Sequence, residues 1–343
     1  MTKEQHYPRQ LLEQVLECTG ASSISNSQPV QNLWSGYGQI VRLQLKIDDA
    51  ARHEKLSVIV KHSKPPVKAQ HPRGWDSDVS VQRKLESYRV EAHWYRHYAK
   101  AVREICSLPA LLGSFVSEDQ SNHQGDNQSW LILEDLDLQF PVRQSRLSMQ
   151  SCKPCLRWLA RFHAHHLQSS CEGLWDTGTY WYLQTRQDEF AAMPSGALKS
   201  AAVQLDETLN NVNFQTLVHG DAKVANFCFS PDSNEVAMVD FQYVGRGCGT
   251  RDVMYFLSSA LNDAECEQYA DALLDVYFAE LAIYIPAQLR QAVEDEWRDL
   301  YVMAWADFHR FLAGWMPGHV KIHNYMRRMS KMALAELSIR QPE

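Results

Sequence analysis

Polar residues capable of chemistry gather where two short predicted strands end. Asp221 and Asn226 follow a short apolar strand, and Asp240 follows a second strand predicted over Glu235–Val239. A turn at residues 231–234 should bring the strand ends together, so the three oxygen-bearing side chains should lie near one point. A small number of hard oxygen ligands suits Mg²⁺ bound to a nucleoside triphosphate, because phosphate oxygens and water complete its coordination.

The spacing of this cluster allows its residues to have different chemical roles. A carboxylate at Asp221, five residues before Asn226, lets one group orient an attacking hydroxyl while the other holds a metal ion. The His-Gly-Asp of residues 219–221 could by itself be a polar turn with capping side chains. The pattern D-x-K-x-x-N, followed by D-F-Q at residues 240–242, favours phosphoryl transfer, which needs positioning and charge neutralisation.

A lysine and a glutamate in the first half of the chain could form a pair. Lys61 closes the apolar run Leu56–Val60, so it is either a solubilising charge at a strand end or a buried cation with a partner. Glu91 borders the apolar face of a predicted helix and could reach Lys61; Glu86 is the alternative, and a surface role for Glu91 is also open. That apolar face comprises residues at spacings of three and four: Val81, Leu85, Tyr88, Ala92, Tyr95 and Ala99.

Two glycines precede a predicted strand. Gly36 and Gly38 lie within Ser35–Gln39, and their freedom from a side chain permits a tight turn whose amides could approach a phosphate. A plain hairpin turn is the favoured alternative from this pattern alone.

Strand patterns fill the first part of the chain and helical patterns the rest. Residues 1–20 resemble an amphipathic helix ending at Gly20, and residues 21–29 form a polar connection. We predict strands over residues 41–47, 56–61, 108–117 and 129–136, followed by helices. The lobe boundary is therefore placed to give residues 1–135 and 136–343.

One predicted helix, over residues 148–168, carries cysteines and histidines on one face. Cys155 and His163 would lie about 12 Å apart along the axis, too far to share a coordination sphere. We expect no metal there, and we expect His163 to be a core histidine with a satisfied hydrogen bond.

Composition excludes several classes of protein. The chain has 343 residues, 45% hydrophobic and 22% charged, which is typical of globular proteins. The formal net charge of −7 argues against a nucleic-acid partner, and the sequence lacks an apolar run long enough for a membrane span. Eight scattered cysteines and a charged start without a leader lead us to expect reduced thiols and a cytoplasmic protein.

The chain resembles a known family over roughly residues 30–325. His219–Asn226 resembles the catalytic loop of the aminoglycoside phosphotransferase and choline-kinase-like enzymes, and residues 240–242 resemble their metal-binding D-F-x. The resemblance is strongest to the ecdysteroid-kinase-like group and its uncharacterised bacterial relatives, through V-I-V-K-H at Lys61 and through Ser87–Glu91, Leu133–Leu136 and Gly249–Asp252. In the last motif Asp252 would support the catalytic loop, although a simple helix N-cap is equally open.

The resemblance implies a fold and a nucleotide site. The fold would be α+β and protein-kinase-like with two lobes, an N-terminal antiparallel sheet with one major helix and a mainly helical C-terminal lobe. Lys61 would bind the α- and β-phosphates of ATP and pair with Glu91. Glu134 and Leu136 would belong to the hinge against the adenine. Gly36 and Gly38 would lie in the loop over the phosphates, although that loop departs from a full G-x-G-x-x-G.

The resemblance also implies catalytic roles. Asp221 would be the base, Lys223 would neutralise charge on the γ-phosphate, and His219 opens the same loop. Asn226 and Asp240 would hold Mg²⁺. The implied activity is transfer of the γ-phosphate of ATP to a hydroxyl of a small-molecule alcohol.

The acceptor should lie among the C-terminal helices. Trp305 belongs to a run of aromatic residues at helical spacing, and a buried helix face is the favoured interpretation. The functional alternative is an aromatic wall for an apolar or cationic alcohol, with Asp307 or His309 at its edge.

Two other classes of function fit the sequence less well. A pseudokinase would bind nucleotide without catalysis, but every expected catalytic side chain is present. A kinase acting on proteins is disfavoured, because Asp252 follows the D-F-Q motif within a dozen residues, which leaves little room for an activation loop.

Overall fold

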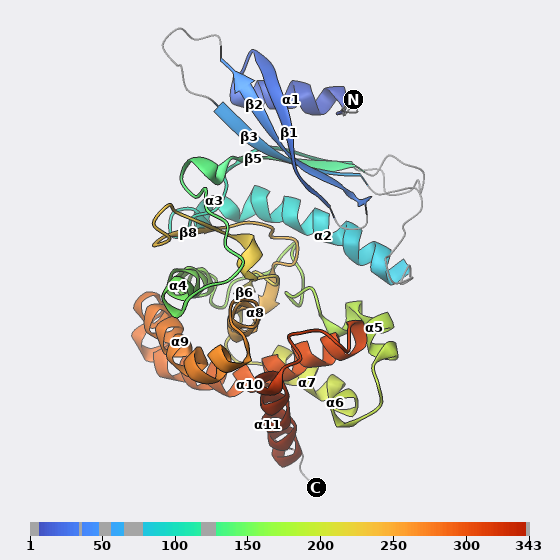
Figure 1. Ribbon diagram of the computed structural model, residues 1–343, viewed down its shortest axis with the longest axis vertical. Helices are drawn as coiled ribbons and strands as arrows, with labels where there is room; N and C mark the ends of the chain where they lie inside the picture. The colour runs from blue at the N-terminus through green and yellow to red at the C-terminus, as the bar shows by residue number, and fades with distance from the viewer. Residues whose placement is uncertain (1–6, 34–35, 48–55, 65–77, 118–127, 341–343) are drawn as a thin grey trace. The chain divides into compact units, whose positions relative to one another are not determined.

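The computed structural model describes residues 7–33, 36–47, 56–64, 78–117 and 128–340 (Figure 1). Two compact units make up the chain, the first from Met1–Lys100 and Pro109–Leu138, the second from Ala101–Leu108 and Gln139–Glu343. Residues 101–108 thus group with the second unit, unlike in the predicted division. The carbonyl of Ser107 explains why, since it accepts hydrogen bonds from the Met238 amide at 3.1 Å and from Trp158 Nε1 at 2.9 Å.

The first unit contains an antiparallel sheet of five strands. Their order in the sheet is β1-β2-β3-β5-β4, and each neighbouring pair runs antiparallel. The bounds are β1 Ser23–Asn32, β2 Gly38–Lys46, β3 Leu56–Ser63, β4 Leu111–Val116 and β5 Ser129–Glu134, with helices α1 Arg9–Thr19 and α2 Asp78–His97. The short α3 Ala99–Val102 begins among the residues of the first unit and ends among those of the second.

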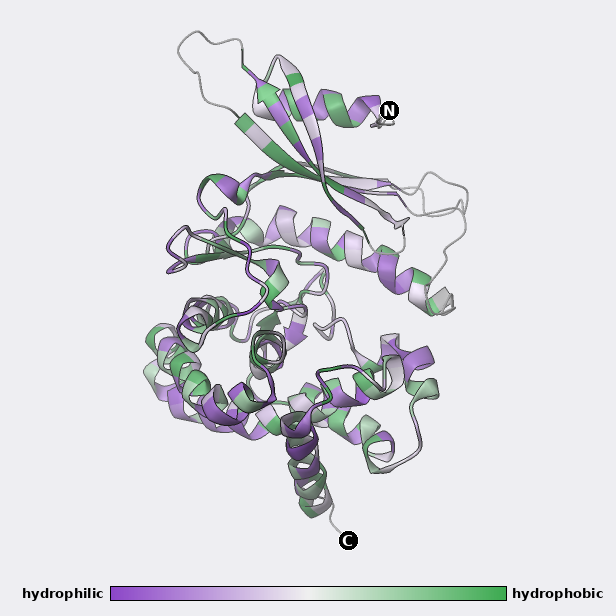
Figure 2. Cartoon of the chain, viewed as in Figure 1, coloured by the Kyte–Doolittle hydropathy of each residue, from purple (hydrophilic) through white to green (hydrophobic). Residues whose placement is uncertain are grey.

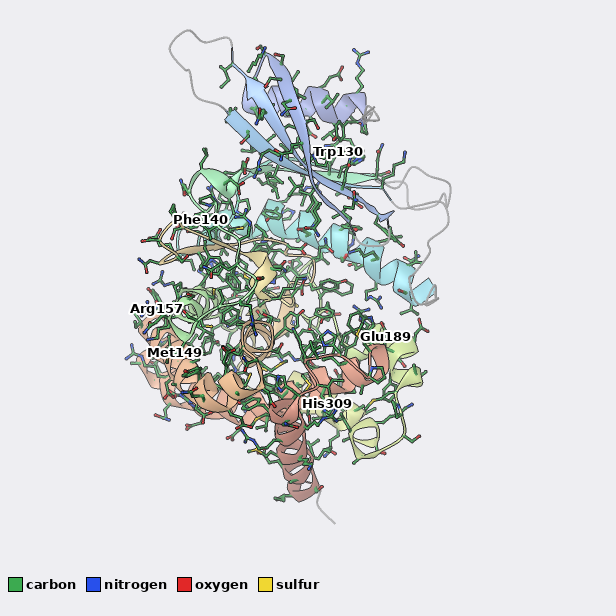
Figure 3. The ribbon with its side chains drawn as sticks, in the orientation of Figure 1. Trp130, Phe140, Met149, Arg157, Glu189 and His309 are labelled. Carbon is green, nitrogen blue, oxygen red and sulfur yellow. The ribbon has the colours of Figure 1, made fainter. Side chains whose placement is uncertain are left out.

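The two faces of this sheet pack against different helices. Alternate residues of β2 and β3 form one core with α1 and with Trp130, which is labelled in Figure 3. The opposite face packs through Ile40 and Tyr37 against Tyr88 of α2. Because side chains alternate along a strand, Lys61 of β3 points away from Val60 and toward the α2 face. The predicted alternation over β2 and the helix ending at Gly20, with φ 67°, are confirmed.

The polar connection predicted for residues 21–29 is wrong. Residues 23–32 form β1, an edge strand whose side chains are almost all exposed. Its backbone pairs with β2, with register shifts near Asn26 and near Gln31. A strand with both faces exposed carries no alternation of apolar and polar residues, so the sequence pattern had nothing to indicate it.

The second unit is mainly helical. Its helices carry hydrophobic and hydrophilic residues interleaved along their length, as amphipathic helices do (Figure 2). The long helices are α4 Met149–His165, α8 Thr250–Ala260, α9 Asp263–Tyr284, α10 Arg290–Trp315 and α11 Asn324–Arg340; the shorter ones are α5 Gln187–Ala192, α6 Ala197–Ser200 and α7 Ala202–Asn210. Two small antiparallel pairs of strands accompany them, β6 Thr216–Val218 with β9 Gly245–Gly247, and β7 Phe227–Phe229 with β8 Val236–Met238.

Two further features complete the fold. All eight cysteines are free thiols, as predicted. Across the described ranges, no helix combines the length and the apolar character needed to cross a bilayer.

Candidate active site

Short strands position the polar cluster in the second unit. β6 pairs with β9 and delivers residues 219–221, and a single turn of 3-10 helix over Val224–Asn226 leads into β7. The Val239 amide donates to the Asn226 carbonyl at 3.0 Å, which joins the segment before Asp240 to this turn. Asp240 itself has φ 71°, a left-handed conformation that is uncommon outside glycine and concentrated at functional sites.

Three side chains of the cluster are in direct contact. Lys223 Nζ lies 2.7 Å from Asp221 Oδ2, and Asn226 Nδ2 donates to the same oxygen at 3.1 Å and to the Asp221 carbonyl at 2.8 Å. Burial by itself would lower the pKa of Lys223, but the charges of Asp221 and Asp240 outweigh it and raise the pKa above its ordinary value. The lysine therefore stays charged and lies under the influence of both carboxylates.

A buried aspartate on α8 holds the loop that carries Asp221. Asp252 Oδ2 accepts a hydrogen bond from the His219 amide at 2.6 Å, and Oδ1 accepts one from the Gly220 amide at 3.0 Å. Helix α8 begins at Thr250 after Gly249, so the N-cap interpretation of Asp252 is wrong. Gly220 has φ 77°, and a Cβ there would meet the Tyr243 carbonyl oxygen at 2.1 Å, so the loop requires glycine at this position.

Two histidines complete this support. The prediction of a core histidine at His163 is confirmed, because its side chain is fully buried, with Nδ1 2.8 Å from the Tyr277 hydroxyl and Nε2 3.2 Å from Asp252 Oδ2. His219 lies with Nε2 3.1 Å from the Val239 carbonyl, and its Nδ1 accepts the Asp221 amide at 3.2 Å. Burial lowers the pKa of His219, so a neutral ring satisfies both bonds. With these two bonds, His219 holds the Asp221 backbone amide and the segment before Asp240 in place.

The structure brings Lys61 and Glu91 together within the first unit. Lys61 Nζ lies 2.9 Å from Oε1 and 2.7 Å from Oε2 of Glu91, and both side chains are buried. The alternative partner, Glu86, is instead paired with Arg89 on the exposed side of α2. A buried ammonium needs such a partner, because an unpaired charge in the interior is costly.

The other predicted nucleotide residues have structural neighbours of their own. Gly38, with φ 133°, starts β2, and a Cβ there would meet the His62 carbonyl oxygen at 2.1 Å, whereas a Cβ at Gly36 would meet no atom of the described structure within 4 Å. Glu134 accepts the Ala110 amide at 3.0 Å, and Leu136 is buried at the start of a 3-10 turn. Ser35, in the same predicted loop, lies outside the described residues.

The predicted acceptor residues lie on α10. Trp305 is fully buried, and Asp307 is held by Arg310 at 2.7 Å and by Trp181 Nε1 at 2.9 Å. His309, labelled in Figure 3, lies with Nδ1 2.9 Å from the Ser330 hydroxyl, and burial lowers its pKa to about 4. The buried-face interpretation accounts for these placements, and contact with an acceptor stays a prediction.

Three residues near Asp221 carry no signal in the sequence. The Tyr180 amide donates to the Gly220 carbonyl at 3.1 Å, and the ring of Tyr180 contacts that of Tyr255, with centroids 5.3 Å apart. Burial raises the pKa of both tyrosines, and the charge of Asp221 raises it further. Lys321, from the segment between α10 and α11, also lies within the electrostatic reach of Asp221. No motif could have indicated these residues, because they come from segments far apart in the chain.

The donor set could hold a divalent cation together with phosphates. Both hydrogen bonds from the Asn226 amide nitrogen go to Asp221, so the amide oxygen Oδ1 is the atom of Asn226 that could bind a metal ion, and Asp240 could add a carboxylate. Within the described residues, no three His, Cys, Asp or Glu side chains form a metal-binding group. An amide oxygen and a carboxylate are hard oxygen donors, which would suit Mg²⁺ that draws its other ligands from phosphates and water.

Comparison with solved structures identifies the class of fold. An amicoumacin kinase, hAmiN, in complex with AMP-PNP, Ca²⁺ and Ami is similar with a TM-score of 0.51 at 13% identity, covering 98% of this chain and 95% of that one. A microcompartment-associated aminopropanol kinase (TM-score 0.48, 12% identity, 96% and 94% coverage) and the choline kinase LicA from Streptococcus pneumoniae (0.48, 9%, 96% and 98%) are also similar. The predicted α+β, kinase-like fold is confirmed.

Comparison of the sequence gives the family. The model of the ecdysteroid kinase-like family matches residues 36–170 and 182–287, and the chain belongs to this family. The resemblance expected from the motifs is thereby confirmed. No curated protein matches the sequence.

Proposed function

We propose that this chain is an ATP-dependent phosphotransferase that moves the γ-phosphate of ATP to a hydroxyl group of a small molecule. The observation that carries the proposal is the contact of Asp221 with both Lys223 and Asn226, on a loop held by Asp252. Phosphoryl transfer requires groups in fixed positions and neutralised charge more than covalent chemistry, and this cluster offers both. Membership of a kinase-like family supports the same reaction.

Asp221 is the proposed base. Its Oδ2 accepts hydrogen bonds from Lys223 and Asn226, and Tyr255 also hydrogen-bonds to this carboxylate, which would receive the proton of an acceptor hydroxyl. The two donors fix the orientation of the carboxylate, which matters because a base must lie within hydrogen-bond reach of the proton it removes. Lys223 lies next to this carboxylate and would neutralise charge on the transferred phosphoryl group.

ATP and Mg²⁺ complete the proposal. Asn226 Oδ1 and Asp240 would hold Mg²⁺, which when bound neutralises negative charge on the phosphates. In the first unit, Lys61 would contact the α- and β-phosphates while Glu91 fixes its ammonium. The amicoumacin kinase of similar fold was solved with AMP-PNP and Ca²⁺, which is in line with a nucleotide and a divalent cation here.

Replacement of Asp221 tests the proposed base. We expect Asp221→Asn to lower turnover by about 10²- to 10⁴-fold, because the amide cannot take a proton from the acceptor. Turnover is measured as release of ADP with a panel of alcohols, and nucleotide binding as the shift of the unfolding midpoint with ATP and Mg²⁺. Asp271→Asn, which changes an exposed carboxylate on α9, is the matched control.

The outcomes separate the alternatives. Retention of more than a tenth of wild-type turnover in Asp221→Asn would exclude Asp221 as the base. A midpoint shift with ATP that does not need Mg²⁺, and no transfer to any alcohol by the wild type, would indicate a nucleotide-binding pseudokinase. No shift with any purine nucleotide would refute the phosphotransferase.

A further inference from the structure

Lys321 occupies a defined place beside the polar cluster of the second unit. Its Nζ lies 3.3 Å from the Ser258 hydroxyl, 4.8 Å from the ring centroid of Tyr255 and 5.4 Å from that of Phe308. Its backbone amide donates to His319 Nδ1 at 3.1 Å. Residues from α8 and α10 thus surround the ammonium, and a hydrogen bond within the connecting segment fixes the chain that carries it.

The ammonium lies on the Asp221 side of the site. The charges of Asp221 and Lys223 both act on the pKa of Lys321. Asp221 is the carboxylate whose charge raises the pKa of Lys321, and it already has Lys223 as its ion-pair partner at 2.7 Å.

The charge of Lys321 is not cancelled by an ion pair. In the described part of the chain, no carboxylate lies within salt-bridge distance of its Nζ. Burial lowers the pKa of Lys321 to about 8, the Asp221 charge opposes this, and the Lys223 charge adds to it. The side chain is still mostly protonated at pH 7, because that pH lies below the pKa. A half-buried ammonium without a carboxylate at salt-bridge distance attracts a negatively charged ligand more strongly than a fully hydrated ammonium does.

Two aromatic rings beside the site are already occupied by a cation of the protein itself. The faces of Tyr255 and Phe308, where a substrate cation could bind, already carry the ammonium of Lys321. Asp307 is engaged by Arg310 in the core, and the lowered pKa of His309 keeps that ring neutral at pH 7. A second positive charge would be repelled by Lys321, whereas an anionic group would be attracted.

We infer that the acceptor is an alcohol bearing an anionic group, whose hydroxyl reaches Asp221 while its anion pairs with the ammonium of Lys321. This inference rests on the proposed phosphotransferase function and names the substrate class of that same site. The transfer itself is unchanged: the acceptor oxygen bonds to the γ-phosphorus, the bond from that phosphorus to the leaving oxygen of ADP breaks, and the hydroxyl proton passes to Asp221.

Matched series of alcohols test the charge preference. The probes are ω-hydroxycarboxylates of graded chain length, with α,ω-diols and ω-amino alcohols of the same lengths, assayed by binding calorimetry and by ADP release with ATP and Mg²⁺. For the wild type, we expect a hydroxycarboxylate to bind and react at least tenfold better than its diol, and the amino alcohol to be poorest. Equal or better use of diols or amino alcohols, or no binding of any hydroxycarboxylate, would overturn the inference.

Variants of Lys321 test the residue itself. Lys321→Met keeps the length and the apolar contact with Tyr255 but removes the charge, so it should weaken binding of the best hydroxycarboxylate by about 10- to 100-fold, with the diol unchanged. Lys321→Arg should restore much of this affinity, and Lys331→Met, on the exposed side of α11, should have no effect. Unchanged affinity in Lys321→Met, with its unfolding midpoint also unchanged, would show that Lys321 does not bind the anion.

The two proposals fail in different ways. Transfer of phosphate to diols or amino alcohols as readily as to hydroxycarboxylates would overturn the anionic acceptor and leave the phosphotransferase intact. Charge-selective binding that depends on Lys321, without ADP release for any probe, would support the anion site and count against the phosphotransferase.

Discussion

Asp252 provides the sharpest test of how the second unit holds its polar loop. Its carboxylate accepts bonds from two backbone amides and lies 3.2 Å from His163 Nε2, and the residue is fully buried. In Asp252→Asn, the side-chain oxygen can take the place of Oδ2 and accept hydrogen bonds from the His219 amide and from His163 Nε2. The side-chain nitrogen then takes the place of Oδ1 and faces the Gly220 N–H. That N–H loses its acceptor, and the two remaining bonds lose their charge.

The magnitude follows from these three bonds. A buried donor without an acceptor costs about 1–3 kcal/mol, and a hydrogen bond to a neutral group is about 1 kcal/mol weaker than one to a charged group. We therefore expect Asp252→Asn to lower the free energy of unfolding by about 3–5 kcal/mol. For a domain of about 200 residues, each kcal/mol lowers the midpoint by about 2–4 °C, so the expected loss is about 6–20 °C.

Thermal unfolding and kinetics together check this expectation. Below the midpoint of the variant, kcat should fall because the loop carrying Asp221 has lost a support, while the KM for ATP changes little. Asp271→Asn, at an exposed position on α9, should stay within about 0.5 kcal/mol of the wild type. An Asp252→Asn protein that unfolds within 2 °C of the wild type would refute the assignment of Asp252 as the support of this loop.

Two further expectations concern other buried charges. Lys61→Met should destabilise the first unit by about 3–5 kcal/mol, because the buried Glu91 then loses the ammonium with which it pairs. The double variant Lys61→Met with Glu91→Leu should regain most of this stability without regaining ATP binding, as measured by unfolding midpoints with and without ATP and Mg²⁺. Equal stability of the single and double variants would contradict the pairing. Burial lowers the pKa of His166 to about 3, below its unfolded value near 6.5, so the unfolded chain binds more protons between these values. The free energy of unfolding should fall as the pH drops below 6.5, by up to about 1.4 kcal/mol per pH unit from this residue. In His166→Leu, the free energy of unfolding measured with denaturant should depend less steeply on pH. An unchanged pH dependence would argue against a buried neutral His166.

Much of the fold and the centre of the site could be predicted from the sequence because the signals are local. Alternation along β2 identifies its buried face, since successive side chains of a strand point to opposite sides. Asp221, Lys223 and Asn226 lie within six residues, so a single loop brings them into contact. The pairing of Lys61 with Glu91 also matches the pattern, because one is on the inner strand β3 and the other borders the apolar face of α2.

The remaining features depended on tertiary structure, because they join residues with no fixed relation in the sequence. β1 forms through backbone pairing at a sheet edge, which leaves no apolar pattern in its side chains. Asp252 reaches the amides of residues 219 and 220 from another helix, and Asp307 pairs with Arg310 in the core. Lys321 stands 100 positions after Asp221 in the chain, so the charge that it brings near Asp221 is a consequence of how α8, α10 and the segment after α10 pack. The sequence determined which side chains could transfer a phosphate, and the packing of the helices determined the charge that an acceptor would meet.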